Sequence, residues 1–335
     1  MDTMEANMDV NALLAALCAR LQANYIYPTV ADEICANLKK HAQAGEYAEI
    51  DEGELLALAL TMHLQEVNHD EHLWVRWHAE ALPEEDDQLR LNPEWQAARK
   101  LEAALDNHGV LKLERLAGNV GYLALGYLHR PEWGGETVAA ALSCLAETNA
   151  LILDLRQCGG GYPGMAALVC SYFIDEKPHL IASIYWRDDD TTQQFWTLPV
   201  VPGRRFGNKP LLVLTGKGTF SAGELLAHVL RSQGQATLIG EQTDGGAHPG
   251  ASYRLTPHFE AFIPIGRTID PQTSGDWEGT GIAPDVAVPA ENALETAHPL
   301  ALRAILELAL PPALPPANEV ARQYLDEVRG LLAKM

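Results

Sequence analysis

The sequence is poor in the features that mark secreted and membrane proteins. Its 335 residues include only 5 cysteines, without paired spacing and without a CxxC motif, so we expect free thiols in a reducing compartment. No apolar run is long enough to span a bilayer. The N-terminal stretch MDTMEANMDV carries acidic residues where a secretory signal would be positively charged. These absences predict a soluble, cytoplasmic protein.

Positive charge is also scarce. Lysine and arginine number 24 against 45 aspartates and glutamates, which gives a formal net charge of -21. Nucleic acid and anionic membranes are therefore poor partners. Hydrophobic residues make up 47% of the chain, enough for a sizeable core, and the length suits two domains.

Apolar periodicity divides the chain into a helical part and an alternating part. Apolar residues recur at helical spacing over 10–38, with a break at Tyr27-Pro28, and again after Asp51, where Glu54 completes a capping-box pattern. The segment HLWVRW alternates like a short strand. From about residue 109 strands and helices alternate, which predicts a mainly parallel α/β layer. The predicted divisions are a tail (1–9), a helical domain ending in a strand and linker (10–108), an α/β domain (109–299) and C-terminal helices (300–335).

The stretch 211–231 is the most informative. An apolar run predicts a buried strand, glycines then form a turn, and helical spacing begins at Ala222. Ser221 stands at this junction. A serine there can be an ordinary N-cap, which the stretch by itself favours, or a nucleophile whose oxyanion is stabilised by the N–H groups of the helix N-terminus.

A glycine run, LDLRQCGGGYPG, closes another buried strand at 153–164. Glycine lets backbone N–H groups approach a ligand, so this loop is either half of an oxyanion hole or simply a tight turn. Neither GxGxxG nor GxxxxGK[ST] is present to support phosphate binding. Asp154 and Arg156 are two residues apart on one strand face, and we interpret them as a structural pair that supports the loop.

Histidines and one carboxylate are the candidate partners of Ser221. The cluster of His63, His69, His72 and His78 matches no metal-ligand spacing, so no metal is predicted. His72 is the exception within it, because it begins an apolar strand and could face a cleft. His248 in GGAHPG and Lys217 stay open as bases. Glu278, in a constrained glycine-rich turn, could orient a histidine.

Six segments in order strengthen these candidates: DEHL, NVGYLAL, LDLRQCGGG, TFSAGE, GEQTDGGAHPG and GRTIDPQTSGDWEGTGIAPDV. Together they resemble the C-terminal processing (tail-specific) peptidase family, in the branch that holds the tricorn core and the repeats of interphotoreceptor retinoid-binding protein. The resemblance covers about residues 10–289. It implies a ClpP/crotonase-like α/β spiral preceded by a small helical domain, and no cofactor.

The resemblance also implies a role for individual residues. Ser221 falls on the nucleophile, His72 of the D-x-H motif (Asp70, Glu71, His72) on the general base, and Glu278 on the assisting carboxylate. The oxyanion hole would be formed by backbone N–H groups of Gly160, Gly161 and Ala222.

Three positions depart from the family pattern. Glycine stands where the Ser–Lys branch has its lysine, Glu71 replaces the serine of the tricorn site, and Cys158 replaces an asparagine. No insertion the size of a PDZ domain is visible between the D-x-H motif and the strand domain.

The predicted function is therefore a serine peptidase acting on a peptide or protein, with a homo-oligomer left open. The alternative is a non-catalytic module that binds an apolar ligand on the same scaffold. A crotonase-like acyl-CoA enzyme is a third reading, against which the TFSAGE motif argues.

Overall fold

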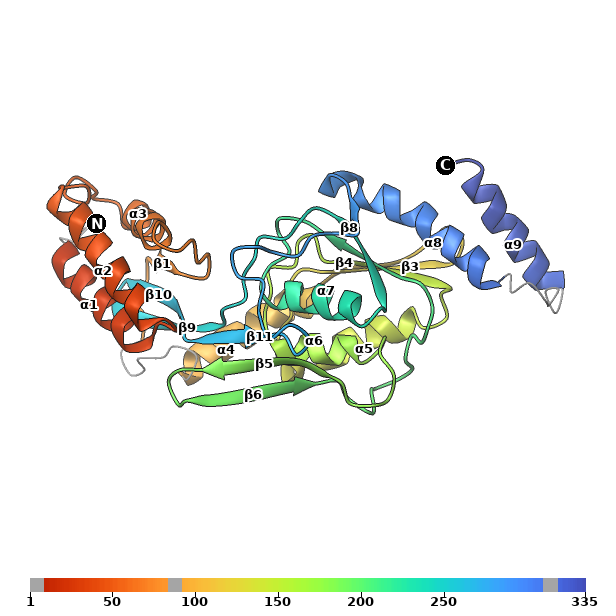
Figure 1. The fold of residues 1–335 in the computed structure, drawn as a ribbon, viewed down its shortest axis with the longest axis horizontal. Helices are drawn as coiled ribbons and strands as arrows, with labels where there is room; N and C mark the ends of the chain where they lie inside the picture. The colour runs from red at the N-terminus through yellow and green to blue at the C-terminus, as the bar shows by residue number, and fades with distance from the viewer. Residues whose placement is uncertain (1–8, 84–91, 310–318) are drawn as a thin grey trace. The chain divides into compact units, whose positions relative to one another are not determined.

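A computed structural model describes residues 9–83, 92–309 and 319–335 (Figure 1). The chain forms two compact units. The first comprises residues 1–99, 183–193 and 246–279, and the second 100–182, 194–245 and 280–335. Two later segments of the chain thus fold with its N-terminal part. Within the described residues, no helix combines the length and apolar character needed to cross a membrane.

The first unit packs helices on a small sheet. Its helices are α1 (Val10–Asn24), α2 (Pro28–Gln43) and α3 (Gly53–Gln65), which confirms the helical periodicity. Its antiparallel sheet has the order β1 (Trp74–Trp77), β10 (Phe259–Pro264) and β9 (Gly250–Thr256). Pro28 begins α2, because proline fits the first helical turn but breaks a continuing helix.

The core of this unit joins the helices to the distant sheet segment. Leu17, Leu21 and Ile34 have no exposed surface, and they share one apolar cluster with Tyr253 and Ala261 of the sheet. This explains why β9 and β10 belong with the N-terminal helices. Without the helices, the apolar face of the hairpin would meet water.

The expected capping box of α3 is wrong. The helix begins one residue after Glu52, which occupies the N-cap position without a side-chain cap hydrogen bond. Asp51 therefore lies outside the cap. Gly53 packs against the Trp77 ring, where a β-carbon would overlap the indole, so tertiary packing sets this boundary.

The second unit is built on a six-stranded sheet among the described residues. In spatial order the strands are β12 (Val286–Ala287), β8 (Ala236–Gly240), β7 (Leu211–Thr215), β4 (Ala150–Asp154), β3 (Val120–Leu125) and β2 (Val110–Leu116). All neighbours pair in parallel except β2 with β3. The predicted parallel α/β layer is confirmed.

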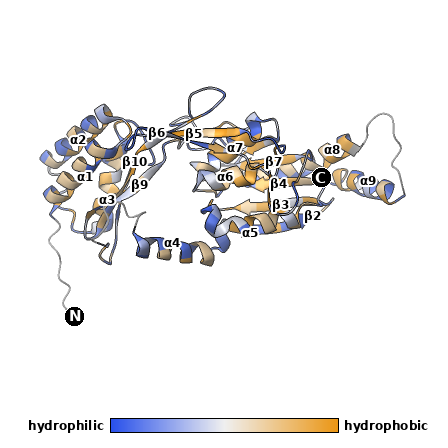
Figure 2. Cartoon of the chain, turned by 90° about the horizontal axis from the view of Figure 1, so that it is seen from below, coloured by the Kyte–Doolittle hydropathy of each residue, from blue (hydrophilic) through white to orange (hydrophobic). Residues whose placement is uncertain are grey.

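Helices cover both faces of this sheet. Helices α5 (Pro131–Cys144), α6 (Pro163–Cys170) and α7 (Ala222–Ser232) lie on one side, and α8 (Ala293–Ala309) lies on the other (Figure 1). Ile152 and Leu214 belong to the cluster that packs on α8. Because both faces are covered, the central strands β4 and β7 are buried along their whole length and are apolar up to their last residues, and Figure 2 colours them mainly as hydrophobic.

Several elements complete the chain. They are α4 (Pro93–Leu105), β5 (Leu180–Trp186), β6 (Thr191–Trp196), β11 (Gly266–Ile269), α9 (Glu319–Leu332) and the 3-10 turns η2 (Asn107–Gly109) and η3 (Ala290–Asn292). Strands β11, β5 and β6 form a further sheet that strand periodicity only partly predicts. The N-terminal tail falls almost wholly outside the described residues.

Candidate active site

Ser221 lies in a sharp turn between β7 and α7, as the sequence predicts. It occupies the N-cap position with φ 52° and ψ -120°, a backbone conformation that L-residues rarely adopt. Such strain costs about 1–3 kcal/mol and persists only where the surroundings impose it. Thr219 holds the turn, since its hydroxyl donates to the Leu155 carbonyl at 2.7 Å and accepts from the Gly216 N–H at 3.0 Å.

The glycine loop lies directly against this serine. Gly160 has φ +103°, and a β-carbon there would lie 2.7 Å from the Ser221 Cβ. Only glycine therefore allows the loop backbone to come this close. Gly161 also has a positive φ, and Ala222 is the first residue of α7. Gly160 and Ala222 thus adjoin Ser221 within one unit, whereas Gly161 packs against the backbone of Leu128, and the oxyanion hole stays a prediction.

Cys158, which departs from the family pattern, is fully buried beneath this loop. Burial raises the pKa of its thiol to about 11, and a hydrogen bond from the Gly160 N–H opposes the rise. The thiol is therefore protonated and unreactive at neutral pH, where it acts as a small packing group. It also contacts an N–H that the resemblance assigns to the oxyanion hole.

Glu224 is a site residue that the sequence reasoning missed. Its fully buried carboxylate accepts hydrogen bonds from the Ser221 N–H (2.8 Å), the Thr243 hydroxyl (2.5 Å) and the Gly245 N–H (2.9 Å). It thus ties the nucleophile turn to the GEQTDGG segment. A glutamate three residues after a helix cap is the pattern that could have indicated it.

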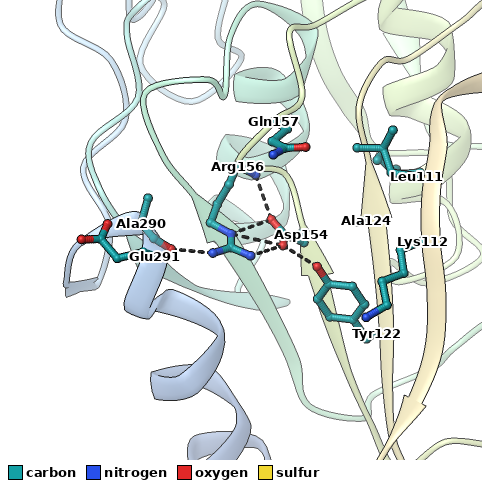
Figure 3. A pocket seen from close by; sticks show the side chains of 10 residues that line it. Leu111, Lys112, Tyr122, Ala124, Asp154, Arg156, Gln157, Ala290 and Glu291 are labelled. Carbon is teal, nitrogen blue, oxygen red and sulfur yellow. Dashed lines mark hydrogen bonds and ion pairs between the residues drawn. The ribbon is translucent and has the colours of Figure 1, made fainter.

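The predicted pair of Asp154 and Arg156 forms. Two nitrogens of the Arg156 guanidinium contact the carboxylate, at distances of 2.5–3.1 Å, and Nη1 reaches the Ala290 carbonyl at 2.5 Å. Tyr122 donates its hydroxyl to Asp154 at 2.6 Å. Figure 3 shows these groups lining a pocket of about 470 Å³. The pair fixes the strand end that leads into the glycine loop.

The first unit brings together a histidine and two carboxylates. Nδ1 of His248 lies 3.2 Å from Asp70 and 3.4 Å from Glu278. Tyr25 donates its hydroxyl to Asp70 at 2.8 Å, and Nε2 of His248 lies 3.4 Å from the Tyr27 hydroxyl. The two tyrosines come from the segment that joins α1 and α2, where sequence alone gave no sign of a site.

Burial and charge act in opposite directions on this cluster. Burial lowers the pKa of His248, but the hydrogen bond to Asp70 and the charge of Glu278 outweigh it, so the net shift is upward. Burial, followed by the charge of Asp70, raises the pKa of Glu278 to about 8, while His248 and the Ala247 N–H oppose this rise. The imidazolium form of His248 therefore neutralises charge that two close carboxylates could not both carry.

His72 is buried in the same unit. Its backbone N–H donates to Asp70 at 3.1 Å, and its ring stacks on Phe262 with 6.1 Å between ring centroids. Burial lowers the pKa of His72 to about 4. Its imidazole is therefore neutral at neutral pH, the state that a general base requires. Glu71, between the two, is exposed.

The structure also describes the surroundings of the other candidate partners of Ser221. Lys217 is exposed and lies 3.4 Å from Asp244, an arrangement that gives no support to a Ser–Lys pair. Ser221 and the glycine loop belong to the second unit, whereas His72, His248 and Glu278 belong to the first. The histidine that lies beside Glu278 is His248, and the assignment of Glu278 to His72 stays a prediction.

Among the residues that the structure describes, two groups of side chains have donor atoms close enough to hold a metal ion. One is Asp70, His248 and Glu278, and the other is His41, His63 and Glu66, each with its donor atoms within 4.8 Å of one another. In the first group, His248 lies between the two carboxylates, while Oε1 of Glu278 is buried without a hydrogen-bond partner.

Comparison with known proteins places the chain in a family of peptidases. Residues 124–288 match the model of peptidase family S41, and residues 3–105 match the N-terminal domain described for this family in eukaryotic IRBP. The two models together span most of the sequence. The chain belongs to peptidase family S41.

Individual relatives agree with this placement. The chain is 30% identical to the carboxyl-terminal-processing protease of Synechocystis over 172 residues, a match that covers 51% of this chain and 38% of the relative. It also matches carboxyl-terminal-processing peptidase 3 of Arabidopsis thaliana at 29% identity, over 42% of this chain and 26% of the relative. The chain thus matches well under half the length of these curated relatives.

Solved structures support the fold. A peptidase structure from Parabacteroides merdae matches with a TM-score of 0.58 at 20% identity, covering 91% of this chain and 99% of that one. The tricorn protease matches with a TM-score of 0.51 at 13% identity, covering 95% of this chain and 37% of that one. At these identities the likeness concerns the fold alone, and it confirms the predicted α/β class with a helical N-terminal region.

Proposed function

We propose that this protein is a serine peptidase that hydrolyses peptide bonds through an acyl-enzyme on Ser221. The observation that carries the proposal is the strained backbone of Ser221 at the N-terminus of α7, in contact range of Gly160. An ordinary N-cap has no need of a positive φ, whereas an exposed nucleophile on a strand-to-helix turn does.

In the proposed mechanism, His72 takes the proton of Ser221 as the hydroxyl attacks the peptide carbonyl. The N–H groups of Gly160, Gly161 and Ala222 stabilise the oxyanion. His72 then protonates the leaving amine, and water hydrolyses the acyl-enzyme with the same histidine as base. A pKa of about 4 keeps the His72 imidazole neutral, so that it can accept a proton, and also makes it a weak base.

Glu278 supports the charge that develops on the base. Its pKa of about 8 lies close to neutral pH, so its charge responds to its neighbours. His248 and Asp70 set that charge through the contacts described above. We propose that Glu278 assists His72 and that His248 and Asp70 hold it in place.

The names of the relatives suggest the substrate. Proteins called carboxyl-terminal-processing proteases match this chain over part of their length. We propose that the substrate is a peptide or protein cut near its C-terminus. A cytoplasmic location belongs to the same proposal and is supported by the free thiols of Cys18, Cys35, Cys144, Cys158 and Cys170.

A fluorophosphonate probe tests the proposal. The purified protein is treated with the probe, and the adduct is located by mass spectrometry beside the variants Ser221→Ala and His72→Ala. We expect labelling at Ser221 that is lost in both variants, and peptide hydrolysis that falls by several powers of ten in Ser221→Ala. A folded protein that is not labelled at Ser221 refutes the proposal and favours the binding of an apolar ligand.

A further inference from the structure

A second cluster of side chains, formed by the ends of α2 and α3, pairs His63 with His41. His41 stands in the last turn of α2 and His63 in the last turn of α3. Their rings are stacked, with 3.6 Å between centroids and 6° between planes. Two carboxylates adjoin them: Glu46, 2.8 Å from Nδ1 of His41, and Glu66, 3.0 Å from Nε2 of His41.

The hydrogen bonds show which nitrogens can face an ion. The Tyr47 hydroxyl lies 2.7 Å from Nδ1 of His63, which leaves Nε2 directed towards Glu46 at 3.6 Å. Glu46 also contacts Nδ1 of His41, whose Nε2 lies 3.0 Å from Glu66, so the His63 ring must turn to bring its Nε2 to the Glu66 side. Metal-binding histidines in proteins are oriented in this way, by a partner on the other ring nitrogen.

Glu66 has a partner of the same kind. Asn37 donates its amide to Oε2 of Glu66 at 3.0 Å and to the His63 carbonyl at 3.1 Å, so one side chain fixes both the carboxylate and the turn that carries it. The two imidazoles are largely buried, with 16% and 13% of their side-chain surface exposed, whereas both carboxylates are nearly half exposed. Oriented imidazoles beside adjustable carboxylates form a site that can close on an ion.

Charge also favours a cation here. Both nitrogens of His41 lie within hydrogen-bond distance of carboxylates. Two carboxylates beside two imidazoles supply negative charge that a divalent ion can balance.

We propose that His41, His63 and Glu66 bind one Zn²⁺ or a similar transition-metal ion, with Glu46 and Tyr47 orienting the imidazoles. Donor atoms of the three ligands lie within 4.8 Å of one another. In a tetrahedral zinc site the donor atoms lie about 3.4 Å apart, so they would have to approach one another by about 1.4 Å at most. Two imidazoles with a carboxylate suit zinc rather than Ca²⁺ or Mg²⁺, which require more oxygen ligands.

Binding requires one ring to tilt, because parallel rings cannot both direct a lone pair at a single ion. The ion would join the ends of α2 and α3, and would therefore stabilise the helical part of the first unit. None of its ligands belongs to the proposed peptidase chemistry. Ser221→Ala should accordingly bind zinc as the wild type does.

Competition with a fluorescent zinc chelator tests the proposal on the full chain after metal removal. We expect one Zn²⁺ per chain, and binding at least about tenfold weaker in His63→Gln and in Glu66→Gln. His179→Gln is the matched control, since His179 pairs with a carboxylate at 2.7 Å like His41 but is not part of a metal-binding group. It should bind as the wild type does. Co²⁺ should show the visible spectrum of a tetrahedral site.

Two results would overturn the proposal. One is no competition by the protein at chain concentrations of about 100 μM, well above the affinity range of structural zinc sites. The other is binding that persists in both variants and is lost in His248→Gln, which would place the ion at Asp70, His248 and Glu278. Glu66 is nearly half exposed, so Glu66→Gln should fold normally, and circular dichroism checks this.

Discussion

Replacing Gly160 with alanine tests the arrangement of the nucleophile turn. The new β-carbon would lie 2.7 Å from the Ser221 Cβ and 3.0 Å from the Phe220 carbonyl oxygen. The distance to the Ser221 Cβ is about 0.7 Å shorter than an ordinary contact of 3.4 Å. The backbone φ of +103° adds strain of about 1–3 kcal/mol for a residue with a side chain. Either the serine turn or the glycine loop must therefore move.

We expect Gly160→Ala to lower the free energy of unfolding by about 2–4 kcal/mol, from strain and overpacking together. A displacement near 1 Å at a catalytic group costs about 100-fold in rate, so kcat/KM and the rate of fluorophosphonate labelling should both fall by about that factor. Urea denaturation and labelling kinetics measure the two effects on the same preparations.

The neighbouring Gly159 provides a matched control. A β-carbon there meets nothing within 4 Å, and its φ lies outside the left-handed region. Gly159→Ala should therefore keep nearly the stability and reactivity of the wild type. If Gly160→Ala behaved like Gly159→Ala in both assays, the close approach of the loop to Ser221 would be refuted.

Two other substitutions probe buried groups of the site. Glu224→Ala leaves two backbone N–H donors and one hydroxyl without their acceptor, and should lower the free energy of unfolding by about 2–6 kcal/mol in urea denaturation. Replacing the exposed Glu307 with alanine should change the free energy of unfolding little. If both substitutions had the same effect, Glu224 would not anchor the nucleophile turn. His72 has a folded pKa of about 4 against an ordinary 6.5, so the unfolded chain binds more protons between these values and stability falls as the pH drops through that window. The loss should reach about 3 kcal/mol by pH 4. His72→Asn should lack this component in denaturation series across the same pH range, and an unchanged difference between pH 7 and pH 4 would show that His72 is not buried as a neutral imidazole.

Local signals in the sequence were sufficient for the second unit. Apolar runs without alternation predicted β4 and β7 as strands covered on both faces, and glycines marked the turns at their ends. Ser221 and Gly160 lie in the turns that follow β7 and β4, so these neighbouring parallel strands bring them to the same edge of the sheet. Motif order then identified the family.

Other features depended on contacts between distant segments. Asp70 meets His248 across 178 positions, and Glu224 meets Gly245 across 21. Residues such as Tyr25 carry no motif of their own. The role of such a residue follows from the side chains that the folded structure places next to it.

The sequence by itself determined most of the elements, the family and the candidate nucleophile, because periodicity, glycine turns and motif order are local properties of the chain. Only the tertiary structure decided that residues 246–279 fold with the N-terminal helices, that His248 is the imidazole beside Glu278, and that His41 stacks on His63. These contacts form because segments that are distant in sequence bury their apolar surfaces together. Local propensity does not predict which segments will pack against each other.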